Sequence, residues 1–247
     1  MEAVTVILLA AGYATRLYPL TKDKPKALLP LGEGVILDTL VSQLAPLKAM
    51  TTLVSNHRFA EQFQAWQRQR QAPVTILDDG TETPESRLGA IRDLELARTR
   101  RGGTRGDALV IGTDNVFTWP LAEFVAQARA HAPHASVALW QAPSAAMATQ
   151  FGVVRRDPDG RITEFSEKSP QPVSNDVALC VYWFPETMHH RFAEFLASGG
   201  NADAPGYFIK WLSEQEPVYG LMMPGAWYDI GTIETYQELL REWRRTA

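Results

Sequence analysis

VILLAAGYATRLYPLTKDKPKALLP, residues 6–30, is the stretch that decides the fold, because a continuous apolar run leads directly into a loop of glycine, proline and basic residues. A short run of apolar residues is typical of a strand that is covered on both faces in a parallel sheet. Ligands of open α/β sheets bind at the carboxyl ends of the strands, where Ala10, Ala11 and Gly12 follow this strand. Small residues let a phosphate approach the backbone, and the amides of a turn bind its oxygens. The stretch therefore predicts a strand that ends in a phosphate-binding loop.

The loop carries four basic residues, Arg16, Lys22, Lys24 and Lys26. A guanidinium suits the planar geometry of phosphate, and a lysine supplies a compact point charge. Composition alone leaves a second interpretation open, a basic loop that is merely solvated. The loop is not a P-loop, since GxxxxGK[ST] is absent. It is not a dinucleotide GxGxxG motif either, since Gly12 has no glycines two and five residues further on.

Similar apolar runs recur along the first 140 residues and alternate with segments of helical spacing; they lie at 51–56, 74–79, 108–114 and 135–141. This alternation predicts a doubly wound, mostly parallel, Rossmann-like α/β sheet. After residue 150, close-set strands predict an antiparallel extension of the same sheet, at 151–157, 161–168 and 177–184. Helices are expected over about 185–198, 208–212 and 233–244. With no repeat or linker, we expect one domain over residues 1–247, with Arg101–Asp107 as a surface loop.

Composition narrows the classes of partner. Lys and Arg number 24 against 28 Asp and Glu, and this net charge of −4 argues against nucleic acid. The longest N-terminal apolar run is too short to cross a membrane and lacks the basic start of a signal peptide. The single cysteine, Cys180, cannot form an internal disulfide and is expected to be a buried thiol in a reducing compartment. We therefore expect a cytoplasmic protein.

Two segments of the opening stretch carry a resemblance. AAGYATRLYPLT followed by PKALLP resembles the signature of the sugar-1-phosphate nucleotidyltransferases, AAGxGTRLxPLT followed by PKxLLP. Four later segments are similar to further family motifs and occur in the same order: VIGTDNVF, FGVV, FSEKSP and WYDIGT. The resemblance implies the nucleotide-diphospho-sugar transferase type of fold, with a nucleotide-binding part at about 1–140 and a sugar-phosphate-binding part at about 141–247. One departure is Ala14, which stands where most members have a second glycine.

The resemblance also implies which residues form the site. Arg16 and Lys26 fall on the signature arginine and lysine and are expected to be catalytic. Asp114 and Asp229 fall on the metal-binding aspartates, which implies Mg²⁺ as cofactor. The nucleotide is expected at Leu9, Ala10, Ala11, Gly12 and Gly89, and the sugar phosphate at Gly152, Glu167, Lys168 and Asn175. Taken singly, the two aspartates also fit strand-end or local backbone-bonding roles, and Lys168 fits a solvated hairpin position; their joint occurrence favours a site.

The reaction implied is attack of a sugar-1-phosphate oxygen on the α-phosphorus of an NTP, with pyrophosphate leaving. The resemblance favours a pyrimidine NTP, dTTP or UTP. Cys180 replaces the usual glycine beside the sugar and leaves the acceptor open. One alternative is a cytidylyltransferase for phosphocholine or a similar phosphate, for which Tyr182, Trp183 and Trp227 offer aromatic faces and Glu167 the acidic group. An alternative of another class is a non-catalytic nucleotide-sugar-binding module. The presence of the charged signature residues disfavours it; these are Arg16, Lys26, Asp114, Lys168 and Asp229.

A few features remain outside this scheme. His189 and His190 lie in an amphipathic segment and are expected at the surface. The segment Asp203–Gly220 either lines the acceptor pocket or contacts another subunit, and a homo-oligomer stays open. Only 18 residues follow Asp229, which leaves no room for an appended β-helix, so one activity is expected.

Overall fold

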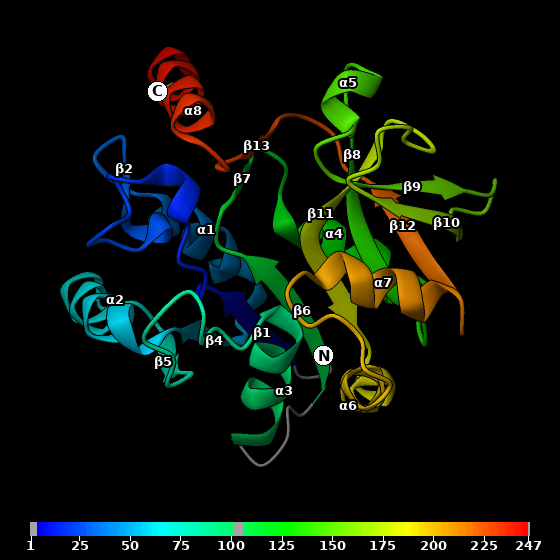
Figure 1. Ribbon diagram of the computed structural model, residues 1–247, viewed down its shortest axis with the longest axis horizontal. Coiled ribbons are helices and arrows are strands. Elements are labelled where there is room, and N and C mark those ends of the chain that lie inside the picture. Colours follow the sequence, from blue (N-terminus) through cyan, green and yellow to red (C-terminus); the bar gives the residue numbers. More distant parts are fainter. Residues whose placement is uncertain (1–3, 101–105, 247) are drawn as a thin grey trace.

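A mixed nine-stranded sheet runs through the part of the chain that the computed structural model describes, residues 4–100 and 106–246 (Figure 1). Its strands are β1 Val4–Leu9, β4 Met50–Ser55, β5 Val74–Asp78, β6 Asp107–Gly112, β8 Ala135–Gln141, β9 Gly152–Arg156, β10 Ile162–Glu167, β11 Asp176–Phe184 and β12 Val218–Met222. Two small sheets accompany it, one of β2 Pro30–Leu31 with β3 Gly34–Val35 and one of β7 Asn115–Phe117 with β13 Trp227–Asp229. The helices are α1 Ile36–Leu44, α2 His57–Arg70, α3 Ala90–Arg100, α4 Leu121–Ala130, α5 Ala145–Ala148, α6 His190–Ala197, α7 Pro205–Ser213 and α8 Ile233–Thr246.

One half of the sheet is parallel, in the order β5, β4, β1, β6. Ile7 of β1 pairs with Thr52 of β4 on one side and with Val110 of β6 on the other. This arrangement confirms the doubly wound, parallel layer that the alternating pattern predicts. Because all four strands run in the same direction, the loops after β1 and β6 leave the sheet at the same edge.

The other half is built around β11, which is antiparallel to both β6 and β8. The neighbours β9 and β10 pair with each other in antiparallel fashion, so the predicted antiparallel extension is confirmed. The place of β8 is a difference from the sequence interpretation, which grouped it with the parallel layer. β11 lies between β8 and β6, so β8 has β11 as its neighbour on one side and β12 on the other. A hydrophobic pattern identifies a strand but does not name its neighbours, and here a later strand inserts between two earlier ones.

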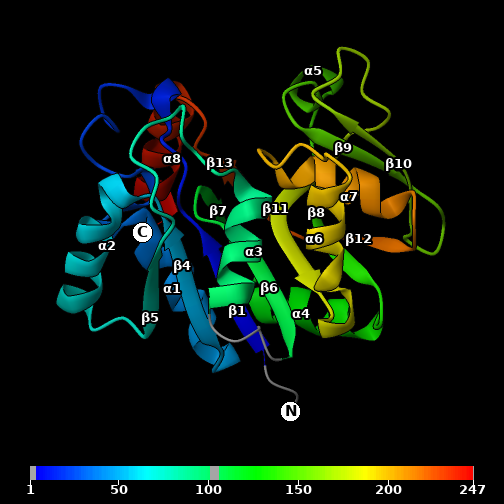
Figure 2. The same cartoon turned by 60° about the horizontal axis from the view of Figure 1, so that its bottom comes forward.

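Helices cover both faces of the sheet, and the alternation of side chains along β1 shows why. Val6 and Leu8 are fully buried in the apolar cluster that includes α1, α2 and α4, whereas Ile7 belongs to the cluster of α3, α6 and α7. Figure 2 shows α3 and α6 on the near side of the sheet with α4 behind it. Successive residues of a strand point to opposite faces, so an apolar run is required when both faces are covered.

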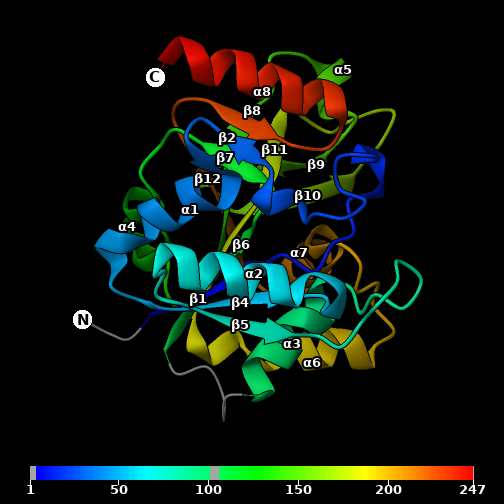
Figure 3. The same ribbon diagram turned by 90° about the vertical axis from the view of Figure 1, so that its left-hand side faces the viewer.

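The C-terminal segment returns to the loop that follows β1. β13 pairs with β7 so that Asp229 lies opposite Asn115. α8 then packs over the first loop through a separate apolar cluster, in which Leu17 and Leu31 meet Ile230 and Leu239 (Figure 3). These contacts bring the WYDIGT motif beside the end of β6, at the edge where the phosphate-binding loop is predicted.

The predicted helix over 185–198 is interrupted near its start. A single 3-10 turn at Glu186–Met188 precedes α6, and His189 between them is only 6% exposed. The surface prediction for His189 is therefore wrong: its ring lies against Phe192, and Nε2 is 3.3 Å from the carbonyl oxygen of Phe184. Most of the predicted loop Arg101–Asp107 lies outside the described residues. Among the described residues, no helix is long and apolar enough to cross a membrane.

Candidate active site

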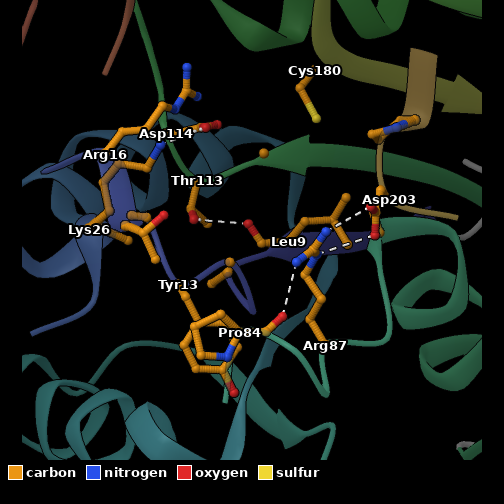
Figure 4. A pocket seen from close by; sticks show the side chains of 18 residues that line it. Leu9, Tyr13, Arg16, Lys26, Pro84, Arg87, Thr113, Asp114, Cys180 and Asp203 are labelled. Atoms are coloured by element: carbon orange, nitrogen blue, oxygen red, sulfur yellow. Dashed lines mark hydrogen bonds and ion pairs between the residues drawn. The ribbon is translucent and has the colours of Figure 1, made fainter. Parts of the chain in front are cut away.

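A cavity of about 570 Å³ lies at the carboxyl ends of β1 and β6 (Figure 4). Leu9, Ala10 and Gly12 line it from the first strand and its loop, and Gly112 and Thr113 line it from the end of β6. Thr113 Oγ1 donates to the carbonyl oxygen of Leu9 at 2.9 Å and fastens the two strand ends together. The cavity therefore lies where the opening stretch predicts a ligand site.

The loop after β1 owes its shape to local backbone contacts. Ala14 has φ 48° and ψ 43°, the left-handed conformation that favours glycine, which gives a physical reason for a glycine at this position in similar sequences. Thr21 Oγ1 donates to the carbonyl oxygen of Ala14 at 2.8 Å, and Asn56 Nδ2 donates to that of Ala11 at 2.9 Å. A Cβ on Gly12 would meet nothing within 4 Å, so open space lies in front of this glycine.

The four basic residues of the loop separate into two pairs. Arg16 and Lys26 line the cavity, whereas Lys22 and Lys24 are exposed and line neither this cavity nor its smaller neighbour. Lys26 Nζ lies 2.8 Å from Asp114 Oδ2 and donates to the carbonyl oxygen of Ile230 at 2.9 Å. Lys22 and Lys24 thus fit the interpretation of a solvated basic loop. Arg16 and Lys26 instead line the cavity in which a ligand is predicted.

The two predicted metal-binding aspartates come together through the pairing of β7 with β13. Ile230 N donates to the carbonyl oxygen of Asp114. Asn115 supports the same arrangement with both ends of its side chain: Nδ2 donates to Asp114 Oδ1 at 3.0 Å, and Oδ1 accepts from Trp227 Nε1 at 2.7 Å. No local sequence pattern predicts this role for Asn115, because its partner Trp227 is 112 residues away.

The pKa values of the two carboxyl groups shift in opposite directions. Burial favours a raised pKa for Asp114, but the charge and hydrogen bond of Lys26 outweigh it and hold the pKa below the usual value. Burial and then the charge of Asp114 raise the pKa of Asp229 to about 6. Negative charge therefore gathers at this pair beyond what Lys26 neutralises. No group of three or more His, Cys, Asp or Glu that could hold a metal occurs within residues 4–100 and 106–246.

A second cavity of about 150 Å³ adjoins the first and shares Asp114, Cys180 and Pro205 with it. Gly152, Glu167 and Lys168 line it, together with the aromatic residues Phe151, Phe165, Tyr182 and Trp227. A Cβ on Gly152 would lie 2.7 Å from Glu167 Oε2 and 2.8 Å from the Phe165 ring, so only glycine leaves these side chains in place. Burial raises the pKa of Glu167.

Cys180 stands in the wall that the two cavities share (Figure 4). The thiol is only partly exposed, and burial followed by the charge of Asp114 raises its pKa to about 12. Its sulfur would lie 2.8 Å from a Cβ placed on Gly112, so the strand end and the thiol are in close contact. The sequence predicts a buried thiol, and the structure differs in that Cys180 is only partly buried, because it borders both cavities.

Three predicted binding residues line neither cavity: Ala11, Gly89 and Asn175. Gly89 has φ 90°, and a Cβ there would lie 2.7 Å from the carbonyl oxygen of Ala202, so this glycine allows a close approach between two backbone segments. The backbone carbonyl of Asn175 accepts from Ala142 N at 2.8 Å. Conversely, Pro84 and Arg87 line the larger cavity without having been predicted, because they lie in the polar loop between β5 and α3. Asp203 and Pro205, at the start of the segment Asp203–Gly220, line it as well.

Comparison with known proteins gives a consistent result. A family model described as nucleotidyl transferase matches residues 5–245. The chain is 26% identical over 229 residues to the mannose-1-phosphate guanylyltransferase catalytic subunit beta of Drosophila pseudoobscura pseudoobscura, which covers 91% of this chain and 58% of that protein. It is 27% identical over 261 residues to the glucose-1-phosphate adenylyltransferase of Thermomicrobium roseum, covering 96% and 59%. The chain thus spans less than two thirds of the length of these relatives.

Solved structures share the fold over nearly the full length of the chain. A Bacillus anthracis chain assigned as a glucose-1-phosphate thymidylyltransferase has a TM-score of 0.80 at 21% identity, covering 98% of this chain and 96% of that one. The CTP:phosphocholine cytidylyltransferase of Streptococcus pneumoniae has a TM-score of 0.75 at 18% identity, covering 98% and 99%.

Proposed function

The chain belongs to the nucleotidyl transferase family, and from this premise we propose that it joins an NTP and a sugar 1-phosphate to give an NDP-sugar and pyrophosphate. The observation that carries the proposal is the meeting of two cavities at Asp114 and Cys180, with Arg16 and Lys26 on the larger side and Lys168 on the smaller. Two substrates that react with each other need adjoining sites, and two anionic substrates need cations where they meet.

We assign the two substrates to different parts of the chain. The larger cavity is lined mainly by the first 140 residues, and we assign the nucleotide to this part. The smaller is lined mainly by residues after 140, and we assign the sugar phosphate to that part. On this assignment Leu9, Ala10 and Gly12 would face the nucleotide, and Gly152 and Glu167 would face the sugar. Ala11, Gly89 and Asn175 would act by shaping the backbone behind the walls.

In this reaction the side chains would position the two substrates and stabilise the charge of their phosphates. Arg16 would bind the departing phosphates, Lys26 the α-phosphate, and Lys168 the phosphate of the acceptor. Lys168 suits this role because its side chain is 61% exposed at the edge of the smaller cavity. A phosphate monoester is largely ionised near neutral pH, so the attacking oxygen needs no general base.

The residues present fit a divalent cation between the two cavities. Asp114 and Asp229 offer carboxylate oxygens, the ligands that Mg²⁺ prefers. Burial and then the charge of Asp114 raise the pKa of Asp229, and a cation would stabilise the ionised form against both. Two protein ligands leave room for phosphate oxygens and water, as is usual for Mg²⁺. When bound there, Mg²⁺ would neutralise phosphate charge as a Lewis acid. Lys26 would keep its contact with Asp114 and hold that carboxylate ionised.

The proposed nucleotide is a pyrimidine NTP, dTTP or UTP. This preference rests on similarity to a thymidylyltransferase structure and to the UTP–glucose-1-phosphate uridylyltransferase of Synechocystis, 25% identical over 252 residues. Guanylyl- and adenylyltransferases are among the relatives as well, so the base has to be tested directly. We place the activity in nucleotide-sugar biosynthesis in the cytoplasm, where a lone cysteine such as Cys180 stays reduced.

A matrix of pyrophosphate-release assays tests the proposal. Purified protein with Mg²⁺ is given dTTP, UTP, CTP, GTP or ATP against glucose 1-phosphate, mannose 1-phosphate, N-acetylglucosamine 1-phosphate or phosphocholine. Release that needs both an NTP and a sugar 1-phosphate supports the proposal and names the pair. No release in any well from folded protein that still binds a nucleotide sugar would instead support the non-catalytic module.

The smaller cavity favours one second candidate, a cytidylyltransferase for phosphocholine or a similar phosphate. Four aromatic residues and one carboxyl group line it together, namely Phe151, Phe165, Tyr182, Trp227 and Glu167. Aromatic faces and a carboxylate attract a quaternary ammonium. The CTP and phosphocholine well tests this candidate, and Glu167→Gln should raise the KM for phosphocholine more than the KM for a neutral sugar because it removes a charge.

A further inference from the structure

Two residues that line the larger cavity, Arg87 and Asp203, form an ion pair that joins the two parts of the chain. Arg87 lies in the loop between β5 and α3, and Asp203 precedes α7, 116 residues later. Arg87 Nη2 donates to Asp203 Oδ2 at 2.9 Å and Nε to Oδ1 at 3.3 Å, while Nη1 donates to the carbonyl oxygen of Pro84 at 3.0 Å. Figure 4 shows the two side chains facing each other among the residues that line the cavity. Pro84 thus holds the guanidinium in the orientation that meets the carboxylate.

The segment that Asp203 belongs to forms a wall of both cavities. Asp203 and Pro205 line the larger cavity, and Ala204, Pro205 and Gly206 line the smaller. Gly206 approaches the carboxyl group of Glu167 so closely that a Cβ on it would lie 2.5 Å from Oε2. A shift of this segment would therefore change the space beside Glu167, where the acceptor is proposed to bind.

The same segment is attached to the nucleotide part on both sides of Asp203, because α7, which follows it, packs in the same apolar cluster as α3. Ile91 N donates to the carbonyl oxygen of Ala202 at 3.0 Å, next to the close approach of Gly89. Upstream, Gly199 with φ 79° provides a turn in which the chain changes direction. Between these two attachments, the side chain of Asp203 adds a polar contact to Arg87, directly before Ala204 and Pro205, which line the smaller cavity.

The exposure of the pair argues against a role in folding. The Arg87 and Asp203 side chains are 51% and 49% exposed, and exposed ion pairs contribute little to folding stability. The two-point contact nevertheless fixes direction as well as distance. Because it links a nucleotide-cavity residue to the wall of the acceptor cavity, we propose that Arg87 and Asp203 are positioning residues through which the nucleotide part sets the affinity for the acceptor. This inference rests on the proposed function.

A double-mutant cycle tests it. Asp203→Ala and Arg87→Ala should each raise the acceptor KM, and raise the dissociation constant for glucose 1-phosphate or phosphocholine in calorimetry, by roughly tenfold, the size of typical coupling between contacting residues. The double Ala variant should be no worse than the more affected single variant. The charge-exchanged variant, Arg87→Asp with Asp203→Arg, should recover most of the affinity. For Asp203→Ala, the KM for the acceptor should rise by a larger factor than the KM for the NTP, because the wall segment that loses its anchor borders the smaller cavity.

The matched control is Glu164→Ala, which removes the Arg155–Glu164 pair on β9 and β10. Its side chains are 58% and 46% exposed, and neither residue lines a cavity, so acceptor affinity should not change. Active wild-type protein with unchanged acceptor affinity in Asp203→Ala, or with additive effects of the two Ala substitutions, would overturn the inference and leave the proposed function standing. A wild-type chain that neither releases pyrophosphate nor binds either acceptor would overturn the proposed function and the inference with it.

Discussion

Lys26 Nζ lies 2.8 Å from Asp114 Oδ2, although 88 residues separate the two in the chain. The same nitrogen donates to the carbonyl oxygen of Ile230, so it joins the loop after β1, the end of β6 and the segment after β13. The basic residues that the opening stretch places at the edge of the sheet therefore have two different roles. Lys26 contacts Asp114 of the carboxylate pair, and Arg16 lines the same cavity, where we propose that it binds phosphate.

Lys26→Ala should lower kcat by about a hundredfold or more, the usual cost of losing a group that stabilises transition-state charge. The protein should remain folded, because Lys26 is at the edge of the cavity and not in an apolar cluster. Lys24→Ala, in the same basic segment but exposed and outside both cavities, is the control and should keep normal turnover. Equal activity of both variants in pyrophosphate release would remove Lys26 from the mechanism.

Asp229→Asn should raise the Mg²⁺ concentration needed for half-maximal activity by about tenfold or more, since one of two carboxylate ligands loses its charge. Excess EDTA should abolish wild-type activity, and added Mg²⁺ should restore it. Asp159→Asn, in an exposed turn away from both cavities, should leave the Mg²⁺ titration unchanged. Superimposable titrations of wild type and Asp229→Asn would show that this residue does not bind the metal.

Cys180 should react slowly with iodoacetamide at neutral pH. Its pKa is raised from 9.0 to about 12 by burial and by the charge of Asp114, so it holds about a thousandfold less thiolate than an ordinary cysteine. Mass spectrometry of the intact protein should show the labelling rate rising with pH up to at least about pH 10. The thiol-free variant Cys180→Ser should stay unlabelled. Complete labelling of the native protein within minutes at pH 7.5 would contradict this account of the thiol.

Asp93 should make stability depend on pH. It is 4% exposed, one carboxyl oxygen has no hydrogen-bond partner, and burial followed by the charge of Asp79 raises its pKa from 3.8 to about 8. The folded chain keeps a proton that the unfolded chain has lost, so this contribution to stability is complete below about pH 4 and is lost as the pH rises to 8. The slope would be on the order of 1.4 kcal/mol per pH unit.

Asp93→Asn removes this titration. The free energy of unfolding of the variant minus that of wild type should therefore increase from pH 5 to pH 8, as measured by urea unfolding at both values and at one pH between them. The comparison cancels the titration of other groups, such as the buried His189. A difference between the two proteins that does not vary with pH would show that Asp93 titrates normally.

The parallel layer could be predicted from the sequence because its signals are local. An apolar run such as Val4–Leu9 has to be covered on both faces, and helical spacing between such runs supplies the covering helices. The position of Asp114 at the edge of the sheet follows from the same reasoning, since it comes directly after β6. The resemblance implies that Asp114 and Asp229 lie close together. In the structure, the pairing of β13 with β7 places Asp229 opposite Asn115, next to Asp114.

Other features depend on contacts that no local pattern encodes. β11 separates β6 from β8, and its place is set by packing between distant segments. The Arg87–Asp203 pair joins two loops that are 116 residues apart, and no local pattern predicts that they meet. His189 shows the limit of amphipathic patterning: a residue beside a helix start is buried because the chain bends into the 3-10 turn that precedes α6.

Oxygen labelling is the most direct test of the central claim, that the acceptor phosphate in the smaller cavity attacks the nucleotide in the larger one. Glucose 1-phosphate, or whichever acceptor the assay matrix identifies, is labelled with ¹⁸O at its non-bridging phosphate oxygens and allowed to react with the matching NTP. The account predicts that mass spectrometry will find all the label in the NDP-sugar and none in the pyrophosphate. Label in the pyrophosphate, or unlabelled NMP and pyrophosphate formed with the acceptor left intact, would contradict it.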